Sequence, residues 1–176
     1  MWKARPVFGS PRMPGIGAIA VLLISVAYLV SSDEEDRGDG EPSGGATTVA
    51  VTSVVDGDTV HATIDGVDES IRYIGIDTPE VDPSIGVECF GEEASARNKE
   101  LVGGERVRLV FGAEERDRYG RLLAYVFVGD ELINAELVRG GYAQTLEIEP
   151  NTDRAALFER LEREAASAGR GLWEAC

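Results

Sequence analysis

Two Asp-Gly pairs divide the middle of the chain into short segments with the character of β-strands. The spacing of these turn signals limits the possible folds more than any other feature. Thr59 to Ile64 alternates apolar and polar residues between Asp56-Gly57 and Asp65-Gly66. Asp-Gly favours the tight turns of β-hairpins. The pattern therefore predicts a three-stranded meander made of Thr47 to Val55, residues 59 to 64, and Ser70 to Ile76.

Later segments add two strands and three helices. Arg106 to Phe111 and Leu122 to Val128 are the further strand candidates. Helical spacing of apolar residues, ended by glycines, predicts helices at Glu92 to Val102, Ile133 to Arg139 and Asp153 to Ala168. Five short strands with a helix after the third indicate an α+β fold, a five-stranded OB-type β-barrel with about three helices.

The N-terminal region has the composition of an export segment. Lys3, Arg5 and Arg12 precede an uncharged, mostly apolar run from Ile16 to Val30. A basic flank before a short apolar run is typical of a signal peptide, and the run is shorter than the roughly 20 residues that span a bilayer comfortably. We expect residues 1–32 to be a signal peptide or a membrane anchor, and the protein to be extracellular or held at the cell surface.

A second unusual segment separates this region from the rest of the chain. Residues 33–46 are rich in Asp, Glu, Gly, Ser and Pro and contain no large apolar side chain. Such a segment buries too little surface to offset the entropy of ordering it, so we expect a flexible acidic linker. Residues 47–176 are then one domain of ordinary size, expected to be monomeric.

The charge of the chain bears on its partners. The formal net charge is -15, and the only lysines are Lys3 and Lys99. Phosphate binding depends on basic side chains that displace counterions, so this charge opposes nucleic-acid binding in dilute buffer. In molar salt the Debye length falls to about 3 Å, which would screen the repulsion. An acidic, lysine-poor protein that works in high salt is the hypothesis that follows.

Three groups of charged residues fall at expected turns and loops. The first is Asp56 to Thr59, which alone is explained as well by a hairpin turn as by a site. The second joins Arg72 to the loop Asp77 to Glu80, and strand alternation would place Arg72 on the face of Ile74 and Ile76. Because a lone buried arginine is costly, this position favours the barrel mouth, facing an anion. The third group is Asp117 to Arg121.

These groups belong to a series of segments that resembles the staphylococcal nuclease family in order and spacing. The segments, which together extend over roughly Thr47 to Trp173, are VVDGDTV around residue 55, IRYIGIDTPE (71–80), GEEAS (91–95), DRYGRLLAYV (117–126), NAELVRGGYA (134–143) and GLW (171–173). The resemblance implies a calcium-dependent nuclease that cuts DNA or RNA and leaves a 3′-phosphate and a 5′-hydroxyl.

The resemblance also implies a role for individual residues. Asp58 and Asp77 would supply carboxylates and Thr78 a backbone carbonyl to Ca²⁺, Arg72 and Arg121 would bind the scissile phosphate, Glu80 would be the general base, and Arg118 and Tyr119 would contact the substrate. The chemistry agrees, because Ca²⁺ prefers hard oxygen ligands and guanidinium groups hold phosphate oxygens in pairs. A positioned carboxylate can accept the proton of an attacking water.

One segment departs from the family. Leu146 and Ile148, beside two glutamates, occupy the stretch in which the family carries nucleotide-contacting tyrosines. We therefore expect an intact catalytic centre and an altered substrate groove. The sequence leaves two alternatives: a catalytically inactive OB-type module that binds nucleic acid, and a surface calcium-binding domain on a membrane stalk.

The chain has two cysteines, Cys89 and Cys176. In an exported protein an even number of cysteines suggests a disulfide, here one that joins the C-terminus to the loop before the first helix. Two free thiols are the alternative.

Overall fold

The computed structural model describes residues 45–82, 84 and 86–176. The expected export segment, residues 1–32, and residues 33–44 of the expected linker lie outside this part of the chain. The first strand begins at Ala46, one residue before the expected start of the domain. Within the described ranges no helix combines the length and the apolar character needed to cross a bilayer.

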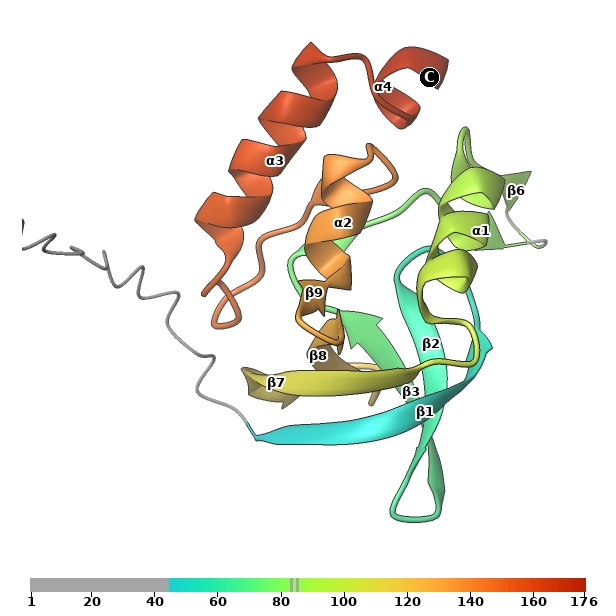
Figure 1. Ribbon diagram of the computed structural model, residues 1–176, viewed down its shortest axis with the longest axis vertical. Helices are drawn as coiled ribbons and strands as arrows, with labels where there is room; N and C mark the ends of the chain where they lie inside the picture. The colour runs from blue at the N-terminus through green and yellow to red at the C-terminus, as the bar shows by residue number, and fades with distance from the viewer. Residues whose placement is uncertain (1–44, 83, 85) are drawn as a thin grey trace, which may run out of the picture. The chain divides into compact units, whose positions relative to one another are not determined.

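Five strands close into a barrel, which confirms the predicted OB-type fold (Figure 1). They are β1 (Ala46–Val54), β2 (Thr59–Ile64), β3 (Val67–Tyr73), β7 (Arg106–Arg116) and β8 (Leu122–Val128). Their order is β3-β2-β1-β7-β8, and a parallel pairing of β3 with β8 closes the ring. This closure places the start of β8 beside the end of β3, and both strand ends carry residues of the expected site.

The described residues form five further strands of two residues each, outside the five-stranded ring. They are β4 (Ile76–Asp77), β5 (Val81–Asp82), β6 (Gly86–Val87), β9 (Glu131–Leu132) and β10 (Gln144–Thr145). β9 pairs with β8, β5 with β6, and β4 with β10. The pairing of β4 with β10 sets Asp77 opposite Gln144, at the edge of the expected site.

The helices cover one side of the barrel, while the β2–β3 hairpin extends from the other side (Figure 1). They are α1 (Gly91–Val102), α2 (Ile133–Arg139), α3 (Ala155–Ser167) and α4 (Leu172–Ala175). α2 lies in the middle, with Ile133, Leu137 and Val138 fully buried. α3 adds a stripe at helical spacing, Phe158, Leu161 and Ala165, that packs into the same core. Burying these stripes is what fixes the helices on the barrel.

The third strand ends earlier than the sequence pattern predicts. β3 stops at Tyr73, and Gly75 adopts a left-handed conformation (φ +79°) that interrupts the strand before Ile76. A side chain at Gly75 would meet the ring of Phe158 at 2.5 Å, so only glycine allows this turn. The prediction that Arg72, Ile74 and Ile76 share one face of a continuous strand is therefore wrong.

Candidate active site

Asp58 enters the site from a tight turn at the start of β2. The carboxylate of Asp56 accepts a hydrogen bond from the backbone N–H of Asp58 (3.0 Å), which closes the turn. Gly57 lies between them, and a Cβ there would come within 2.6 Å of the Thr78 hydroxyl oxygen. The Asp-Gly pair thus serves two purposes, because it turns the chain and lets the turn pack directly against Thr78.

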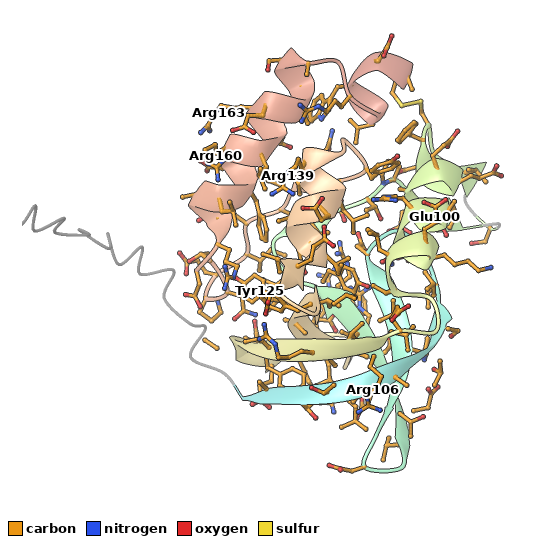
Figure 2. The ribbon with its side chains drawn as sticks, in the orientation of Figure 1. Glu100, Arg106, Tyr125, Arg139, Arg160 and Arg163 are labelled. Atoms are coloured by element: carbon orange, nitrogen blue, oxygen red, sulfur yellow. A yellow bond between two sulfur atoms is a disulfide. The ribbon has the colours of Figure 1, made fainter. Side chains whose placement is uncertain are left out.

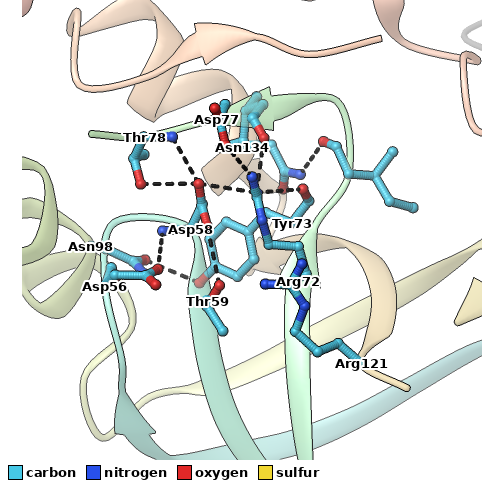
Figure 3. Close-up of polar contacts among 12 residues, drawn as sticks. Asp56, Asp58, Thr59, Arg72, Tyr73, Asp77, Thr78, Asn98, Arg121 and Asn134 are labelled. Atoms are coloured by element: carbon cyan, nitrogen blue, oxygen red, sulfur yellow. Dashed lines mark hydrogen bonds and ion pairs between the residues drawn. The ribbon is translucent and has the colours of Figure 1, made fainter. Parts of the chain in front are cut away.

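The carboxylate of Asp58 is almost completely buried and is surrounded by donors (Figure 3). Its Oδ2 accepts hydrogen bonds from the backbone N–H (2.8 Å) and the hydroxyl (2.9 Å) of Thr78, and its Oδ1 accepts one from the Thr59 hydroxyl (3.1 Å). Burial raises the pKa of Asp58 to about 7, although Arg72 and the Thr78 donors act in the opposite direction. The ionised form of this group depends on nearby positive charge.

Arg72 provides that charge and joins two carboxylates. Its Nη1 lies 3.0 Å from Asp58 Oδ2, and its Nη2 donates to Asp77 Oδ1 at 2.5 Å. Nη1 also donates to the carbonyl oxygens of Ile76 (2.8 Å) and Tyr73 (3.2 Å). Only 11% of the Arg72 side chain is exposed, so the guanidinium is buried with its charge compensated. The structure places this side chain in a nearly closed setting, where the anions that face it are the carboxylates of Asp58 and Asp77.

Glu80 lies in the same electrostatic environment but is more exposed. Partial burial, followed by the negative charges of Asp56 and Asp77, raises the pKa of Glu80 above its usual range, and Arg72 acts in the opposite direction. The structure brings Asp58, Arg72, Asp77 and Thr78 together by direct bonds. Glu80 follows Thr78 by two residues and is exposed.

Arg121 reaches the site from the neighbouring strand. In the parallel pairing of β3 with β8, Arg72 lies opposite Leu123, so Arg121, two residues earlier, projects from the same face as Leu123. Figure 3 shows its side chain extending toward Arg72. Its Nε donates to Asp117 Oδ2 at 2.7 Å, and no bond joins it to Asp58 or Asp77 within the described residues.

Asp117 organises the loop that carries Arg121. Its Oδ1 accepts hydrogen bonds from the backbone N–H groups of Tyr119 and Arg121, both at 2.9 Å. Burial alone would raise the pKa of Asp117, but the bonds from the Arg121 side chain and from these two amides outweigh it and lower the pKa. A charged carboxylate thus holds both the backbone of the loop and the direction of the Arg121 side chain.

The two residues expected to contact substrate form an exposed pair in this loop. Arg118 donates to the Tyr119 hydroxyl at 2.6 Å, and its Cζ lies 4.7 Å from the centre of the Tyr119 ring. Arg121 approaches the same ring at 5.6 Å, and 68% of Tyr119 is exposed. The exposed Tyr119 ring thus has Arg118 and Arg121 as its two cationic neighbours.

The donor set fits a hard divalent cation. The described residues hold no group of three or more His, Cys, Asp or Glu side chains arranged for a metal. They do hold two carboxylates, Asp58 and Asp77, that both bind the guanidinium of Arg72. Thr78 directly follows Asp77 in the chain. Ca²⁺ completes its coordination with backbone carbonyls and water and takes only oxygen ligands. The chemistry of these residues suits Ca²⁺ and does not suit a metal that needs nitrogen or sulfur ligands.

A cleft of about 270 Å³ lies beside Asp77 and Thr78. It is lined by Asp77, Thr78, Pro79, Glu88, Cys89, Gln144, Leu172 and Cys176. Cys89 and Cys176 are joined by a disulfide with a Cα–Cα distance of 6.0 Å. The C-terminus of the chain is therefore covalently attached to the wall of this cleft.

Two buried asparagines position the site, and neither is predicted as a site residue by the sequence patterns. Asn98 of α1 donates to the carbonyl of Asp56 (2.9 Å) and accepts a hydrogen bond from the Tyr73 hydroxyl (3.0 Å). Asn134 of α2 donates to the carbonyl of Ile74 (2.9 Å). A signal for Asn98 is present in the sequence, because it stands on the buried stripe of its helix between Ala94 and Val102.

The segment after β10 exposes aliphatic and acidic side chains. Leu146 and Ile148 are exposed, and Glu147 and Glu149 between and after them are exposed as well. The segment starts beside the turn at Gly75, since Leu146 N–H donates to the Gly75 carbonyl (3.0 Å). The altered substrate groove at this segment stays a prediction.

Comparisons with known proteins give one consistent result. The profile of a family described as "Staphylococcal nuclease homologue" matches residues 70–175. The chain is 38% identical to "Thermonuclease" of Staphylococcus intermedius over 160 residues, which cover 88% of this chain and 95% of that protein. It is 34% identical to "Thermonuclease" of Staphylococcus hyicus, over 88% of this chain and 91% of that protein. It is 39% identical to "Endonuclease YncB" of Bacillus subtilis (strain 168), over 71% of this chain and 61% of that protein.

Proposed function

The chain belongs to the staphylococcal nuclease family, and from this premise we propose that it is a calcium-dependent endonuclease that hydrolyses phosphodiester bonds of DNA or RNA and leaves 3′-phosphate ends. One observation carries the proposal. A single buried guanidinium, that of Arg72, holds the carboxylates of Asp58 and Asp77 together, Arg121 extends toward it, and Glu80 follows Thr78 by two residues in the chain. A protein that only bound nucleic acid would not need this combination.

The two arginines supply fixed positive charge for the reaction. Hydrolysis of a phosphodiester builds negative charge on the phosphoryl oxygens as water attacks in line with the leaving oxygen. Arg72 retains its Nε–H and one Nη2 hydrogen without a partner among the described residues. Arg121 retains both terminal nitrogens in the same way. Both guanidiniums can therefore donate to the phosphoryl oxygens without losing the bonds that orient them.

Glu80 is the residue suited to accept the proton of the attacking water. It is exposed enough to meet a water, and its raised pKa increases its affinity for a proton. Water attacks phosphorus and gives a proton to Glu80 while the bond to the 5′-oxygen breaks. The leaving 5′-oxygen takes a proton from solvent, so that one product ends in a 3′-phosphate and the other in a 5′-hydroxyl. Ca²⁺ held by Asp58, Asp77 and the Thr78 carbonyl would add positive charge against the phosphoryl oxygens.

The cellular setting is a further part of the proposal. We place the protein outside the cell or at its surface, either released by cleavage of residues 1–32 or tethered to the membrane through residues 16–30, and acting as a monomer. The basic flank and apolar run of the N-terminal sequence support this setting. The disulfide between Cys89 and Cys176 also supports it, because disulfides persist in oxidising compartments.

A cleavage assay tests the proposed function. The full chain is incubated with DNA and with RNA, in low and in molar salt, with Ca²⁺ or with a chelator. We expect cutting only with Ca²⁺, products with 3′-phosphate ends, and loss of cutting in Glu80→Gln. The matched control is Glu131→Gln, an exposed glutamate of β9, which should cut like the unchanged chain.

Each alternative predicts a different outcome. Binding of nucleic acid without cutting would identify a module that lacks catalysis. Calcium binding without affinity for nucleic acid would identify a surface calcium-binding domain. Cutting that persists with the chelator, or in Glu80→Gln, would contradict the roles proposed for the metal and for the base.

A further inference from the structure

The main chain of Glu80 is held by a reciprocal pair of hydrogen bonds to Glu88. The backbone N–H of Glu80 donates to Glu88 Oε2 at 3.0 Å, and the backbone N–H of Glu88 donates to the Glu80 carbonyl at 2.9 Å. The two bonds join the ends of the loop that runs from residue 80 to residue 88. Within the described residues the Glu80 carboxylate accepts no hydrogen bond, so its position depends on its backbone.

The start of α1 packs against the same peptide. A Cβ at Gly91 would lie 2.6 Å from the Glu80 carbonyl oxygen and 3.1 Å from that of Pro79. Gly91 in turn donates its N–H to the Glu88 carbonyl at 3.0 Å. The Glu80 peptide therefore lies between Glu88 and the first turn of α1, with no space for a side chain at Gly91.

The disulfide connects the segment that contacts the Glu80 peptide to Cys176, which follows α4. Cys89 directly follows Glu88 and is bonded to Cys176, as the yellow bond between α4 and the segment before α1 shows in Figure 2. α4 is itself fixed, because Leu172 is buried and its N–H donates to the Gly141 carbonyl at 2.9 Å. A covalent link thus joins the segment that clamps Glu80 to α4, and a backbone hydrogen bond joins α4 to Gly141, two residues after α2.

We propose that Glu88 and the Cys89–Cys176 disulfide are positioning elements for catalysis, forming a brace that fixes the Glu80 backbone beside Asp77 and Thr78. The inference rests on the proposed function, in which Glu80 takes a proton from water. A general base must lie within hydrogen-bond reach of its water, and a displacement of about 1 Å can cost about 10²-fold in rate. The brace restricts such displacement in an exposed residue.

The two parts of the brace have unequal weight. Glu88 bonds to Glu80 directly, whereas the disulfide acts through Cys89. The segment keeps a second anchor without the disulfide, because the ring of Phe90 stacks on that of Tyr142 with centroids 5.5 Å apart. Loss of the Glu88 carboxylate should therefore reduce catalysis more than loss of the disulfide.

Steady-state kinetics on variants of the full chain test the brace. We expect Glu88→Ala to lower kcat by about 10- to 100-fold with KM changed less than about twofold, because only the base is displaced. Glu88→Gln keeps an oxygen that accepts the Glu80 N–H and should recover kcat to within about threefold of the unchanged chain. Glu92→Ala, an exposed first-turn residue of α1, is the matched control and should change nothing.

The disulfide is tested in two ways. The double variant Cys89→Ser, Cys176→Ser should lower kcat by about three- to tenfold, again with KM unchanged. The effect should be smaller than that of Glu88→Ala, because the direct bond from Glu88 to the Glu80 backbone remains. A dithiol reduces the disulfide of the unchanged chain to two thiols and is itself oxidised to a cyclic disulfide. The reduced chain should have the same kcat as the double variant. Thermal unfolding of each variant verifies that it is folded.

Amide hydrogen exchange separates a failed brace from a failed function. Peptides that contain the Glu80 amide should exchange faster in Glu88→Ala than in the unchanged chain and at the unchanged rate in Glu88→Gln. Unchanged exchange and unchanged kcat in Glu88→Ala would overturn the inference, as would a Gln variant no better than the Ala variant. Faster exchange in a protein that never cuts would instead reject the proposed function and retain the clamp as a structural feature.

Discussion

The two arginines of the site are held in opposite ways. Arg72 is nearly buried and is bonded to carboxylates and carbonyls that come from the turn before β2, from the end of β3 and from β4. Arg121 is one-third exposed and depends on Asp117, four residues earlier in its own loop. Contacts between separate strands and turns orient the Arg72 guanidinium, whereas a contact within one loop orients that of Arg121.

Because of this difference, the two arginines should contribute differently to the free energy of unfolding and to catalysis. A buried ion pair leaves an uncompensated charge when one partner is removed, and an exposed pair leaves a group that water can solvate. Arg72 should therefore be needed for both folding and activity, and Arg121 for activity alone. Substitutions at and around the two arginines can break or sharpen that separation, beginning with the largest expected effect.

Arg72→Ala should give the largest loss. It leaves Asp58 buried without its positive partner, and we expect a loss of about 3–5 kcal/mol in the free energy of unfolding, measured by denaturant titration without Ca²⁺ at pH 8. We also expect kcat/KM to fall at least about 10³-fold, the scale found for arginines that stabilise phosphoryl transfer. Unchanged stability would show that the Asp58–Arg72 contact is not needed to hold the two strands.

Arg121→Ala should reduce kcat/KM on the same scale, about 10³-fold, because it removes the second cation from the phosphoryl oxygens. Its free energy of unfolding should change by no more than about 0.5 kcal/mol, as expected for a partly exposed pair four residues apart. A loss of stability as large as that of Arg72→Ala would remove the distinction between the two arginines.

Asp117→Asn should have an intermediate effect. The amide oxygen can still accept the two backbone hydrogen bonds of the loop, but it no longer carries the charge that directs the Arg121 side chain. We expect kcat/KM to fall about tenfold, in proportion to a charged hydrogen bond of about 1.5 kcal/mol. Asp130→Asn, an exposed aspartate at the β8–β9 turn, is the control.

The pH dependence of stabilisation by calcium should give the smallest effect. The pKa of Asp58 is about 7 in the folded chain and near 3.8 for an unperturbed carboxyl. Between these values the folded state holds a proton that the unfolded state has lost, so this group makes the metal-free protein less stable as pH rises from about 4 to about 7. In the proposed site Ca²⁺ would bind the ionised carboxylate, so the increase in melting temperature on adding Ca²⁺ should grow from about pH 5.5 to about pH 8.

The same comparison explains what the sequence could and could not predict. β2 and α2 have the predicted bounds, because turn residues and helical spacing are local signals. The break at Gly75 was missed, because IRYIGI is a continuous strand pattern and the turn depends on the distant ring of Phe158. The burial of Arg72 was missed for the same reason, since its partners come from separate segments. The loop around Asp117, which is stabilised locally, was recognised as a group from the sequence.

The central claim is that Asp58 and Asp77 bind one Ca²⁺ while Arg72 and Arg121 hold a single phosphate beside it. A crystal structure of the chain with Ca²⁺ and a nucleoside 3′,5′-bisphosphate tests this claim most directly. We predict one cation bound by both carboxylates and the Thr78 carbonyl, and one phosphate in contact with both guanidiniums. A cation bound elsewhere, or a phosphate that contacts only one of the two arginines, would contradict the account.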